Sequence, residues 1–330
     1  MKKITFKEFF NKFNYYYDNQ NYSNLGGNIF HRIYIFIDYM FSFLVEGCSL
    51  TNYFVYGFFN MKHTKKKQFV TWSRQRWKYR QCNDVNYDNY LGNKKDINTL
   101  YEKYVKRDWI MSNESTFMEF CKFVDNNPIF IAKPEEGTEG RGVQKFENLN
   151  DEEKKHVYDE LSKEAYLLEK YIVQHEVISK LHPYSVNTIR ITTIRDNEKV
   201  NIMSAALRMG RDKAVNDNYT TMGIVAQVDI DTGIIMSTGV DKLNHRYVKH
   251  PTTGEQIVGL KIPYWKECIE FVNELAQVVP QVRYTGWDIA ITEDGPILIE
   301  GNYSGNFQVQ QHGDMVGKYQ LYKDVIARIK

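Results

Sequence analysis

The sequence predicts an α+β protein with a mostly helical N-terminal extension, and three stretches carry this prediction. Residues 287–299 read as an apolar β-hairpin, and residues 128–143 read as a strand that runs into a glycine-rich loop. Residues 265–279 repeat apolar side chains every three to four positions, which is typical of an amphipathic helix. Because strand patterns and a helical pattern occur in one chain, we expect helices and sheets to pack together.

Composition narrows the class of protein. Of the 330 residues, 25% are charged and 42% hydrophobic, as in a globular protein with room for two or three subdomains. The net charge of +2 provides no global field, so no nucleic-acid partner is expected. The N-terminus lacks an apolar signal core, and the apolar run 33–45 is too short to span a bilayer. The four cysteines form no Cys-x-x-Cys or zinc spacing, which favours a reduced, cytoplasmic protein: Cys48, Cys82, Cys121 and Cys268.

The N-terminal region has two parts. Residues 33–45 keep helical spacing, whereas residues 61–80 hold eight lysines and arginines and no acidic residue. The default interpretation of this basic segment is a solvated face. The alternative is docking on an anionic membrane surface or a phosphorylated carrier, which would place the protein at the inner face of the membrane.

The next elements surround a candidate phosphate site. Residues 93–105 predict a helix, and residues 128–133 predict a strand that ends on Lys133. The loop that follows contains Gly137, Gly140 and Gly142, whose backbone N–H groups can form an anion-binding nest. The order Gly-x-x-Gly-x-Gly matches neither a P-loop nor a dinucleotide fingerprint, so the alternative of a plain turn stays open.

Four further elements precede the final hairpin. Residues 151–163 predict a charged helix, and residues 165–172 a strand with a connector that leads to Glu176. Residues 188–195 and 201–208 predict a hairpin, and a second hairpin is expected from 223–229 and 233–236. Arginines and threonines alternate with isoleucines in the first of these strands, which is typical of a half-buried strand.

The final hairpin is the strongest candidate for a metal site. Glu293-Asp294-Gly295 predicts a three-residue loop, which would place Thr292 opposite Pro296 and Asp288 opposite Glu300. Asn302 would then lie on the same face as Glu300. Two carboxylates and an amide oxygen are hard ligands that suit Mg²⁺, and a cation would offset the repulsion between the carboxylates. The alternative is a solvent-exposed hairpin end.

In their order along the chain, these motifs resemble the ATP-grasp superfamily. The resemblance implies two α/β subdomains that clamp ATP, at residues 93–180 and 181–330, after a helical region at 1–92. It also implies a role for each motif residue. Nucleotide contacts fall to Lys94, Lys133, Gly137, Gly140, Gly142, Glu169, Lys170, Tyr171, Ile172, Glu176 and Asn218, and Mg²⁺ ligands to Asp288, Glu300 and Asn302. Within the first set, Glu169 to Ile172 would be the adenine hinge, and Glu176 would bind the ribose.

The runs Ser185-x-Asn-Thr-Ile-Arg190 and Gly286-Trp-Asp through Glu300-Gly-Asn302 are similar to the sugar-transfer-associated ATP-grasp group. That resemblance implies an amide-forming ligase of cell-surface polysaccharide assembly that joins a small carboxylate, sugar-linked or not, to an amine. ATP and Mg²⁺ would be required, with Lys133, Arg190 and Arg208 holding the transferring phosphoryl group. A kinase that phosphorylates a hydroxyl and a non-catalytic nucleotide-binding scaffold remain alternatives. Four histidines are candidates for substrate contact: His182, His245, His250 and, first for testing, His312.

Overall fold

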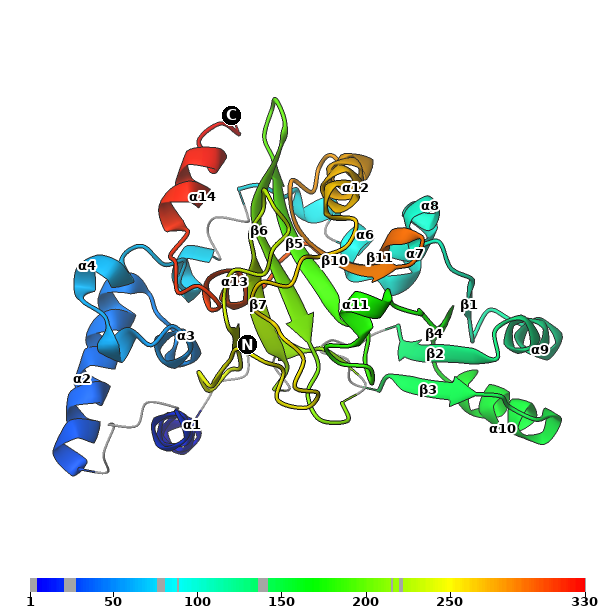
Figure 1. Cartoon of the computed structure of the whole chain (residues 1–330), viewed down its shortest axis with the longest axis horizontal. Coiled ribbons are helices and arrows are strands. Elements are labelled where there is room, and N and C mark those ends of the chain that lie inside the picture. The colour runs from blue at the N-terminus through cyan, green and yellow to red at the C-terminus, as the bar shows by residue number, and fades with distance from the viewer. Residues whose placement is uncertain are drawn as a thin grey trace.

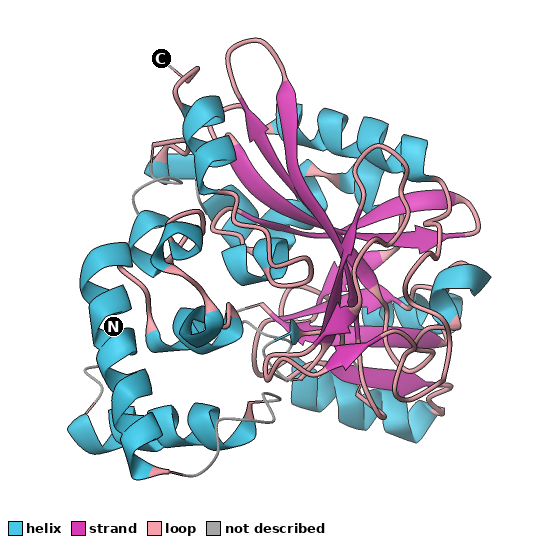
Figure 2. Ribbon diagram, turned by 60° about the vertical axis from the view of Figure 1, so that its left-hand side comes forward, coloured by secondary structure: helices cyan, strands magenta, loops and turns pink. Residues whose placement is uncertain are grey.

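The computed structural model describes residues 5–20, 28–75, 81–87, 89–135, 142–214, 216–219 and 222–329. Figure 1 shows a large central sheet, a smaller sheet to one side and a group of N-terminal helices on the other side. Figure 2 shows the same two sheets in magenta with helices packed around them. The fold is thus α+β, as the sequence predicts.

The larger sheet has seven strands in the order β11-β10-β5-β6-β7-β8-β9, and neighbouring strands are antiparallel. Alternation along β5 sends Ile189 and Ile191 into the main core and leaves Arg190 on the opposite face. The strands are β5 (Thr188–Arg195), β6 (Val200–Met209), β7 (Ile224–Val228), β8 (Gly239–Val240), β9 (Arg246–Tyr247), β10 (Tyr284–Thr292) and β11 (Gly295–Asn302).

Helices cover the apolar face of this sheet and also its edge at β11. Helix α12 (Trp265–Val278) buries Cys268, Val272 and Leu275 in the main core. The same core takes residues from α6 (Asn89–Gly92), α7 (Lys94–Leu100) and α8 (Glu102–Val105). The sequence assigns α7 and α8 to the 93–180 unit, but their apolar residues pack under the larger sheet. Further elements are η2 (Val85–Tyr87), α11 (Glu176–Ser179), α13 (Phe307–Gln311) and α14 (Tyr319–Ile326).

The smaller sheet has the order β1-β4-β2-β3 and is antiparallel throughout. Its strands are β1 (Trp109–Met111), β2 (Ile129–Pro134), β3 (Gln144–Glu147) and β4 (Tyr166–Lys170). Helices α9 (Phe117–Asn126) and α10 (Asp151–Leu161) pack on it through Phe120, Phe123 and Leu161, which meet Phe130 of β2. Both helices begin with a capping box, at Thr116 and Asn150, which fixes where they start.

The N-terminal helices form a separate aromatic core. They are α1 (Phe6–Asn19), α2 (Ile29–Glu46), α3 (Leu50–Val55), η1 (Phe58–Asn60) and α4 (His63–Lys66). Tyr53, Phe54 and Tyr56 are fully buried in this core. Among the described helices, none combines the length and hydropathy needed to cross a bilayer.

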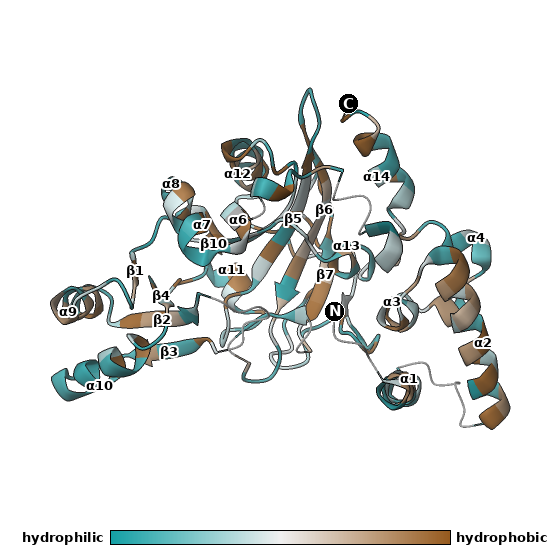
Figure 3. Ribbon diagram, turned by 180° about the vertical axis from the view of Figure 1, so that it is seen from behind, coloured by the Kyte–Doolittle hydropathy of each residue, from teal (hydrophilic) through white to brown (hydrophobic). Residues whose placement is uncertain are grey.

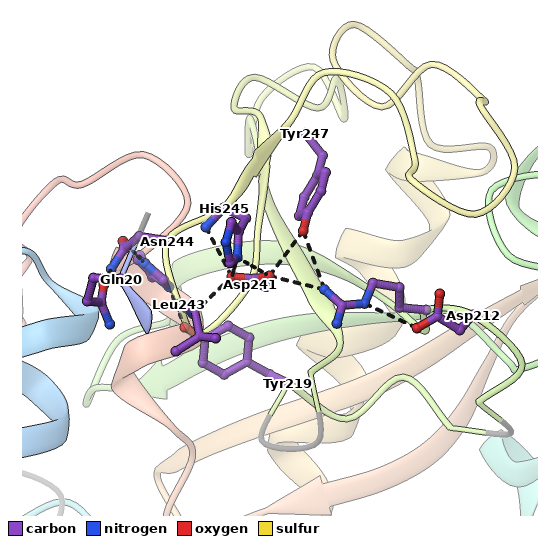
Figure 4. A network of polar contacts seen from close by, with 10 residues as sticks. Gln20, Asp212, Tyr219, Asp241, Leu243, Asn244, His245 and Tyr247 are labelled. Atoms are coloured by element: carbon purple, nitrogen blue, oxygen red, sulfur yellow. Dashed lines mark hydrogen bonds and ion pairs between the residues drawn. The ribbon is translucent and has the colours of Figure 1, made fainter. Parts of the chain in front are cut away.

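A polar network around Asp241 joins these helices to the larger sheet (Figure 4). The buried Asp241 carboxylate accepts hydrogen bonds from Arg211, Tyr247 and His245, which fixes the loop between β8 and β9. Asn244 of that loop donates to the Gln20 side chain at 2.6 Å and to the Phe54 carbonyl at 3.0 Å. Because these donors and acceptors are buried, the contact holds the helical region against the sheet.

Two predicted details of the strands are wrong. The hairpin turn has two residues, because Thr292 pairs with Gly295 and Ile291 with Pro296. The Thr292 hydroxyl accepts from the Asp294 N–H at 3.2 Å and donates to the Gly295 carbonyl at 3.0 Å, which closes the shorter turn. Residues 233–236 form no strand and meet the sheet only through isolated bridges, one of them from Val228 to Ile235.

Candidate active site

A cavity of about 790 Å³ lies where the smaller sheet, the larger sheet and the N-terminal helices meet. Strands β2 and β4 contribute Lys133 and Glu169, and the larger sheet contributes Arg190, Arg208 and Asp288. Most of the residues that the sequence singles out, although far apart along the chain, are therefore brought together. The predicted site residues that line the cavity are Lys94, Lys133, Glu169, Lys170, Tyr171, Ile172, Arg190, Arg208, Asn218, Asp288, Glu300 and Asn302.

The predicted metal ligands all line the cavity. Asp288 of β10 is paired across the hairpin with Glu300 of β11, as predicted. A β-bulge at Ile299 compensates for the shorter turn, because Ile289 pairs with Leu298 and Asp288 with Glu300. The amide of Asn302, oriented to satisfy both its atoms, donates to Glu300 Oε1 at 3.2 Å and accepts from Arg190 Nη2 at 3.2 Å.

Two arginines hold Asp288. Arg190 Nη2 and Arg208 Nη1 each donate to Asp288 Oδ2 at 2.7 Å, and Arg190 Nε donates to Oδ1. Arg208 also donates to Asp217 Oδ1 at 3.0 Å. Although burial opposes ionisation, the two guanidinium groups lower the pKa of Asp288, so it stays charged at neutral pH.

The chemistry of this donor set fits Mg²⁺. Oδ1 of Asp288 accepts from a single arginine atom and keeps a lone pair for a cation. The pKa of Glu300 is raised, first by loss of surrounding water and then by the charge of Asp288. Glu300 is exposed toward the cavity, and a cation bound beside it would relieve its repulsion from Asp288. Among the described residues, no group of three His, Cys, Asp or Glu side chains is arranged to hold a metal, and the predicted set consists of two carboxylates and the amide of Asn302.

A buried ion cluster positions Lys133. Its ammonium pairs with Glu169, which also accepts from Arg107 and, at 2.9 Å, from Asn98. Burial would raise the pKa of Glu169, but the charges of Arg107 and Lys133 hold that pKa at about 2. Sequence reasoning missed Arg107 and Asn98 as supports of this lysine. Glu169 therefore acts in the structure as the partner of Lys133 at the hinge.

Lys94 approaches the cavity from the first turn of α7. Its ammonium donates to the Glu135 carbonyl oxygen at 3.0 Å, just beyond the strand that carries Lys133. Burial lowers the pKa of Lys94, and Glu300 is among the charges that oppose this change. Two lysines from different elements thus lie at the same end of the cavity, where an anionic group of a ligand would be stabilised.

The hinge segment lines the cavity directly after Glu169. The backbone N–H of Lys170 donates to the Asp108 carbonyl and that of Tyr171 to the Ile129 carbonyl, so the connector is held against the smaller sheet. Ile131 of β2 and Ile299 of β11 contribute apolar wall on two sides. Neither isoleucine is recognisable from the sequence, because apolar residues in strands normally face a core.

Several predicted residues lie elsewhere. Glu176 starts helix α11, is exposed and pairs with Lys180, because the connector from β4 turns away before it. Gly137 and Gly140 lie outside the described residues. Gly142 has φ +74, and a Cβ there would come within 2.8 Å of Pro134, so glycine is required.

None of the four candidate histidines is among the residues that line the cavity. His312 is fully buried and hydrogen-bonds to Tyr219 and, at 2.7 Å, to Asn244. Its burial lowers its pKa to about 3, so the ring is neutral at pH 7. His182 and His250 are also buried, and His245 pairs with Asp241. The structure gives these rings packing partners, so the idea of substrate contact is not supported.

The N-terminal helical region supplies a third wall that sequence reasoning did not anticipate. Ser49, Thr51, Asn52, Trp72 and Gln75 line the same cavity as the metal hairpin. Their sequence offers no signal for this role, because neutral polar residues occur equally in helix caps and on exposed faces. Proximity to the site depends on how the helices dock, through contacts such as Asn244 with Gln20.

Two antiparallel sheets that enclose a cleft lined with lysines, arginines and paired carboxylates define a protein of the ATP-grasp class. The chain belongs to the sugar-transfer-associated ATP-grasp family, whose model matches residues 79–323. No curated protein sequence matches the chain.

Solved structures with similar folds include an ATP-grasp ligase, PsnB, complexed with a minimal precursor, Mg and ADP. It is 14% identical, with a TM-score of 0.47, over 75% of this chain and 62% of that one. A D-alanine–D-alanine ligase from Bacillus anthracis is 15% identical, with a TM-score of 0.45, over 75% of this chain and 69% of that one. The chain thus spans less than two thirds of the length of PsnB.

Proposed function

We propose that this protein is an ATP- and Mg²⁺-dependent ligase that joins a small carboxylate to an amine through an acyl phosphate. The observation that carries the proposal is the pairing of Asp288 with Glu300 on one side of a cavity that also holds Lys133, Arg190 and Arg208. Cations and carboxylates in one enclosed site suit transfer of a phosphoryl group, whose charge must be stabilised on several sides at once.

The nucleotide would lie across the cavity from the hinge to the hairpin. The base would enter between Ile131 and Ile299 and present its edge to the backbone of residues 170–172. Because the N–H groups of Lys170 and Tyr171 are already used, the Ile172 N–H is the proposed donor to the base. Lys94 and Lys133 would then face the phosphates, with Asn218 on the opposite wall.

Asp288, Glu300 and Asn302 would hold the magnesium ion. When bound, Mg²⁺ supplies positive charge that stabilises the phosphate oxygens. The remaining positive charge comes from the chain itself. Arg190 and Arg208 orient the acceptor carboxylate and the transferring group, and Lys133 is kept in place by Glu169. The substrate carboxylate attacks the γ-phosphorus of ATP to give an acyl phosphate and ADP. The amine then attacks the acyl carbon and expels inorganic phosphate.

The family description supports a substrate linked to sugar metabolism, and we propose a role in cell-surface polysaccharide assembly on that basis. The test is a screen of amino acids, amino sugars and sugar acids for ADP release by the purified protein with ATP and Mg²⁺. An amide product with free phosphate supports the ligase. Hydroxylamine should also trap the acyl phosphate as a hydroxamate. A stable phosphomonoester would instead establish a kinase, and hydroxamate would then be absent.

A further inference from the structure

The wall that the N-terminal helices contribute to the cavity has a chemistry of its own. We propose that Ser49, Thr51, Asn52, Trp72 and Gln75, together with Gln308 of α13, form a subsite for a neutral, hydroxyl-rich ligand, that is, a carbohydrate. The proposal deepens the proposed function, because the bound sugar would present its reacting group to the arginines. Its test below does not depend on ATP chemistry.

Asn52 is the first observation. Its side chain is only 5% exposed, and among the described residues its Oδ1 atom has no hydrogen-bond partner. The neighbours Tyr53, Phe54 and Val55 are fully buried, so α3 cannot turn Asn52 toward open solvent. A buried acceptor without a donor is costly, and the cavity that Asn52 lines is where a ligand O–H or N–H would satisfy it.

The character of the wall is the second observation. Of its described residues, Lys12 is the only charged one, whereas the opposite wall holds lysines, arginines and carboxylates. Hydroxyl and amide side chains both donate and accept, which matches sugar hydroxyls that do the same. Trp72 adds a flat aromatic surface of the kind that packs against the C–H face of a sugar ring.

The test uses thermal melting of the full chain without nucleotide, with methyl glucoside, methyl galactoside and N-acetylglucosamine as probes. We expect at least one sugar to raise the melting temperature with a response that saturates in the millimolar range. Non-specific stabilisation by sugars rises without saturation. Asn52→Leu should abolish the saturable shift, whereas Asn11→Leu, on the exposed face of α1, should keep it.

If Asn52→Leu melts too early for this comparison, Gln75→Leu, at a half-buried position on the same wall, replaces it. The absence of a saturable shift with every sugar, or an equal shift in parent and wall variant, would overturn the subsite. A separate shift with ATP and Mg²⁺, retained in Asn52→Leu, reports on the proposed function alone. If ATP and Mg²⁺ produce no shift in the melting temperature of the parent protein, that result would count against the ligase but not against the sugar site.

A second, independent feature is the outer face of α2. Ten large apolar side chains of this 18-residue helix are exposed, and Figure 3 shows brown segments along it at the edge of the molecule. The side of the helix that packs on the protein buries Ile35, Tyr39, Ser42 and Glu46. The other side is also apolar, and it is turned outward. The exposed residues are Ile29, Phe30, Ile33, Tyr34, Ile37, Met40, Phe41, Phe43, Leu44 and Val45.

Charge indicates what covers this face. The acids of α2 lie against other groups of the protein: Asp38 pairs with the buried Lys66 at 2.7 Å, and a carboxylate oxygen of the buried Glu46 lies 2.7 Å from Nδ1 of His63. Helix α4 lies beside the C-terminal half of α2, because the rings of Phe41 and His63 are 5.5 Å apart. Of the basic segment, Arg74 donates to the carbonyls of Lys67 and Phe69, and residues 76–80 lie outside the described residues.

Three lysines at α4 remain exposed at the rim of the apolar face: Lys62, Lys65 and Lys67. An apolar helix face with cations at its border suits the surface of an anionic membrane, where the helix lies in the interface. We propose that α2 docks the protein on such a surface. The helix is about 27 Å long and would lie in the plane of the membrane surface.

Sedimentation with phosphatidylcholine vesicles, with and without phosphatidylserine, tests this surface on the full chain. We expect pelleting with the anionic vesicles at low salt, weaker pelleting as salt rises and little with neutral vesicles. Ile37→Glu with Leu44→Glu should abolish binding without lowering the melting temperature. Met118→Glu, 81% exposed on α9, is the matched control.

No pelleting with phosphatidylserine vesicles at low salt would overturn the membrane proposal, as would equal pelleting of the double variant. A dimer in analytical ultracentrifugation that the double variant dissociates, together with absent vesicle binding, would show that a second copy covers the face instead.

Discussion

The carboxylate of Glu169 forms an ion pair with the ammonium of Lys133, and the side chain of Glu169 is only 3% exposed. Arg107 and Asn98 donate to its other oxygen, so both oxygens of this carboxylate are engaged by neighbouring side chains. Lys133 projects from the end of β2 into the cavity, and the ion cluster determines where its charge lies. The hinge strand and the phosphate-facing lysine are thus coupled through one buried carboxylate.

Glu169→Gln should destabilise the protein by about 3 kcal/mol at pH 7, because the change leaves the buried Arg107 and the partly buried Lys133 without their partner. The pKa of Glu169 is about 2 in the folded protein and lies near its ordinary value of 4.5 in the unfolded chain. A lowered folded pKa stabilises the native state above pH 4.5, and this contribution is lost as pH falls toward 2. Urea unfolding at several pH values should therefore show the parent and variant converging in acid. A constant difference between pH 7 and pH 3 would contradict the ion cluster.

The nucleotide preference follows from the hinge. ATP with Mg²⁺ should raise the melting temperature more than GTP with Mg²⁺, because the backbone at residues 170–172 offers its fixed donor and acceptor to an adenine edge. Thermal melting at matched nucleotide concentrations measures the difference. Equal shifts would count against the hinge assignment, even if the phosphate end of the cavity is correct.

Arg208→Lys should reduce ADP release by about tenfold to a hundredfold. The guanidinium bridges Asp288 and Asp217, and a single ammonium cannot reproduce both contacts. Losing one charge-assisted hydrogen bond costs roughly 1.5–3 kcal/mol, which corresponds to that range of rates. Arg283→Lys, whose guanidinium contacts Asn197 outside the cavity, should leave ADP release unchanged. Full activity in Arg208→Lys would show that Arg208 does not hold the reacting groups.

His312 should contribute to acid sensitivity and not to catalysis. Its folded pKa of about 3 lies below its ordinary value of 6.5, so the unfolded chain binds the proton first. Stability from this group is present above pH 6.5 and declines as pH falls toward 3. His312→Gln should lose stability overall and show a shallower decline over that range. A variant with unchanged stability but no ADP release would return His312 to the list of substrate contacts.

Periodicity predicts several elements of residues 93–302, among them the strands at 188–195 and 201–208 and the helix at 265–279, whereas the strand expected at 233–236 does not form. Residues 188–195 illustrate this, since Ile189 and Ile191 enter the core while Arg190 faces the cavity. The prediction that Asp288 and Glu300 are cross-strand partners is correct, although the predicted length of the turn is wrong. The predicted three-residue loop and the observed two-residue turn with a bulge at Ile299 give the same pairing. Local turn chemistry did not reveal the bulge, because no single residue type requires one.

What the sequence does not reveal depends on tertiary contacts. The connector after Ile172 turns away from the cavity, so the spacing that suggests Glu176 as a ligand does not bring it there. Asn52 and Trp72 reach the site only because the N-terminal helices dock beside the larger sheet. The helical spacing of residues 33–45 predicts α2 correctly, but it does not show that one apolar face would remain uncovered.

The most direct test of the account is Glu300→Gln. This change keeps the size of the side chain but removes the charge that faces Asp288 across the hairpin. If Glu300 helps to hold Mg²⁺, its loss should weaken stabilisation of the transferring phosphate by about 3 kcal/mol, roughly a hundredfold in rate. The melting temperature should not fall, because the change relieves the repulsion that raises the pKa of Glu300.

Glu293→Gln, at the exposed hairpin turn, is the matched control and should keep parental activity. The measurement is ADP release with ATP and Mg²⁺, using background ATP hydrolysis until the substrate pair is known, together with a melting curve. The account predicts a hundredfold loss in Glu300→Gln with an unchanged or higher melting temperature. Full ADP release in a stably folded Glu300→Gln would contradict it, because Glu300 would then be a surface carboxylate and not a metal ligand.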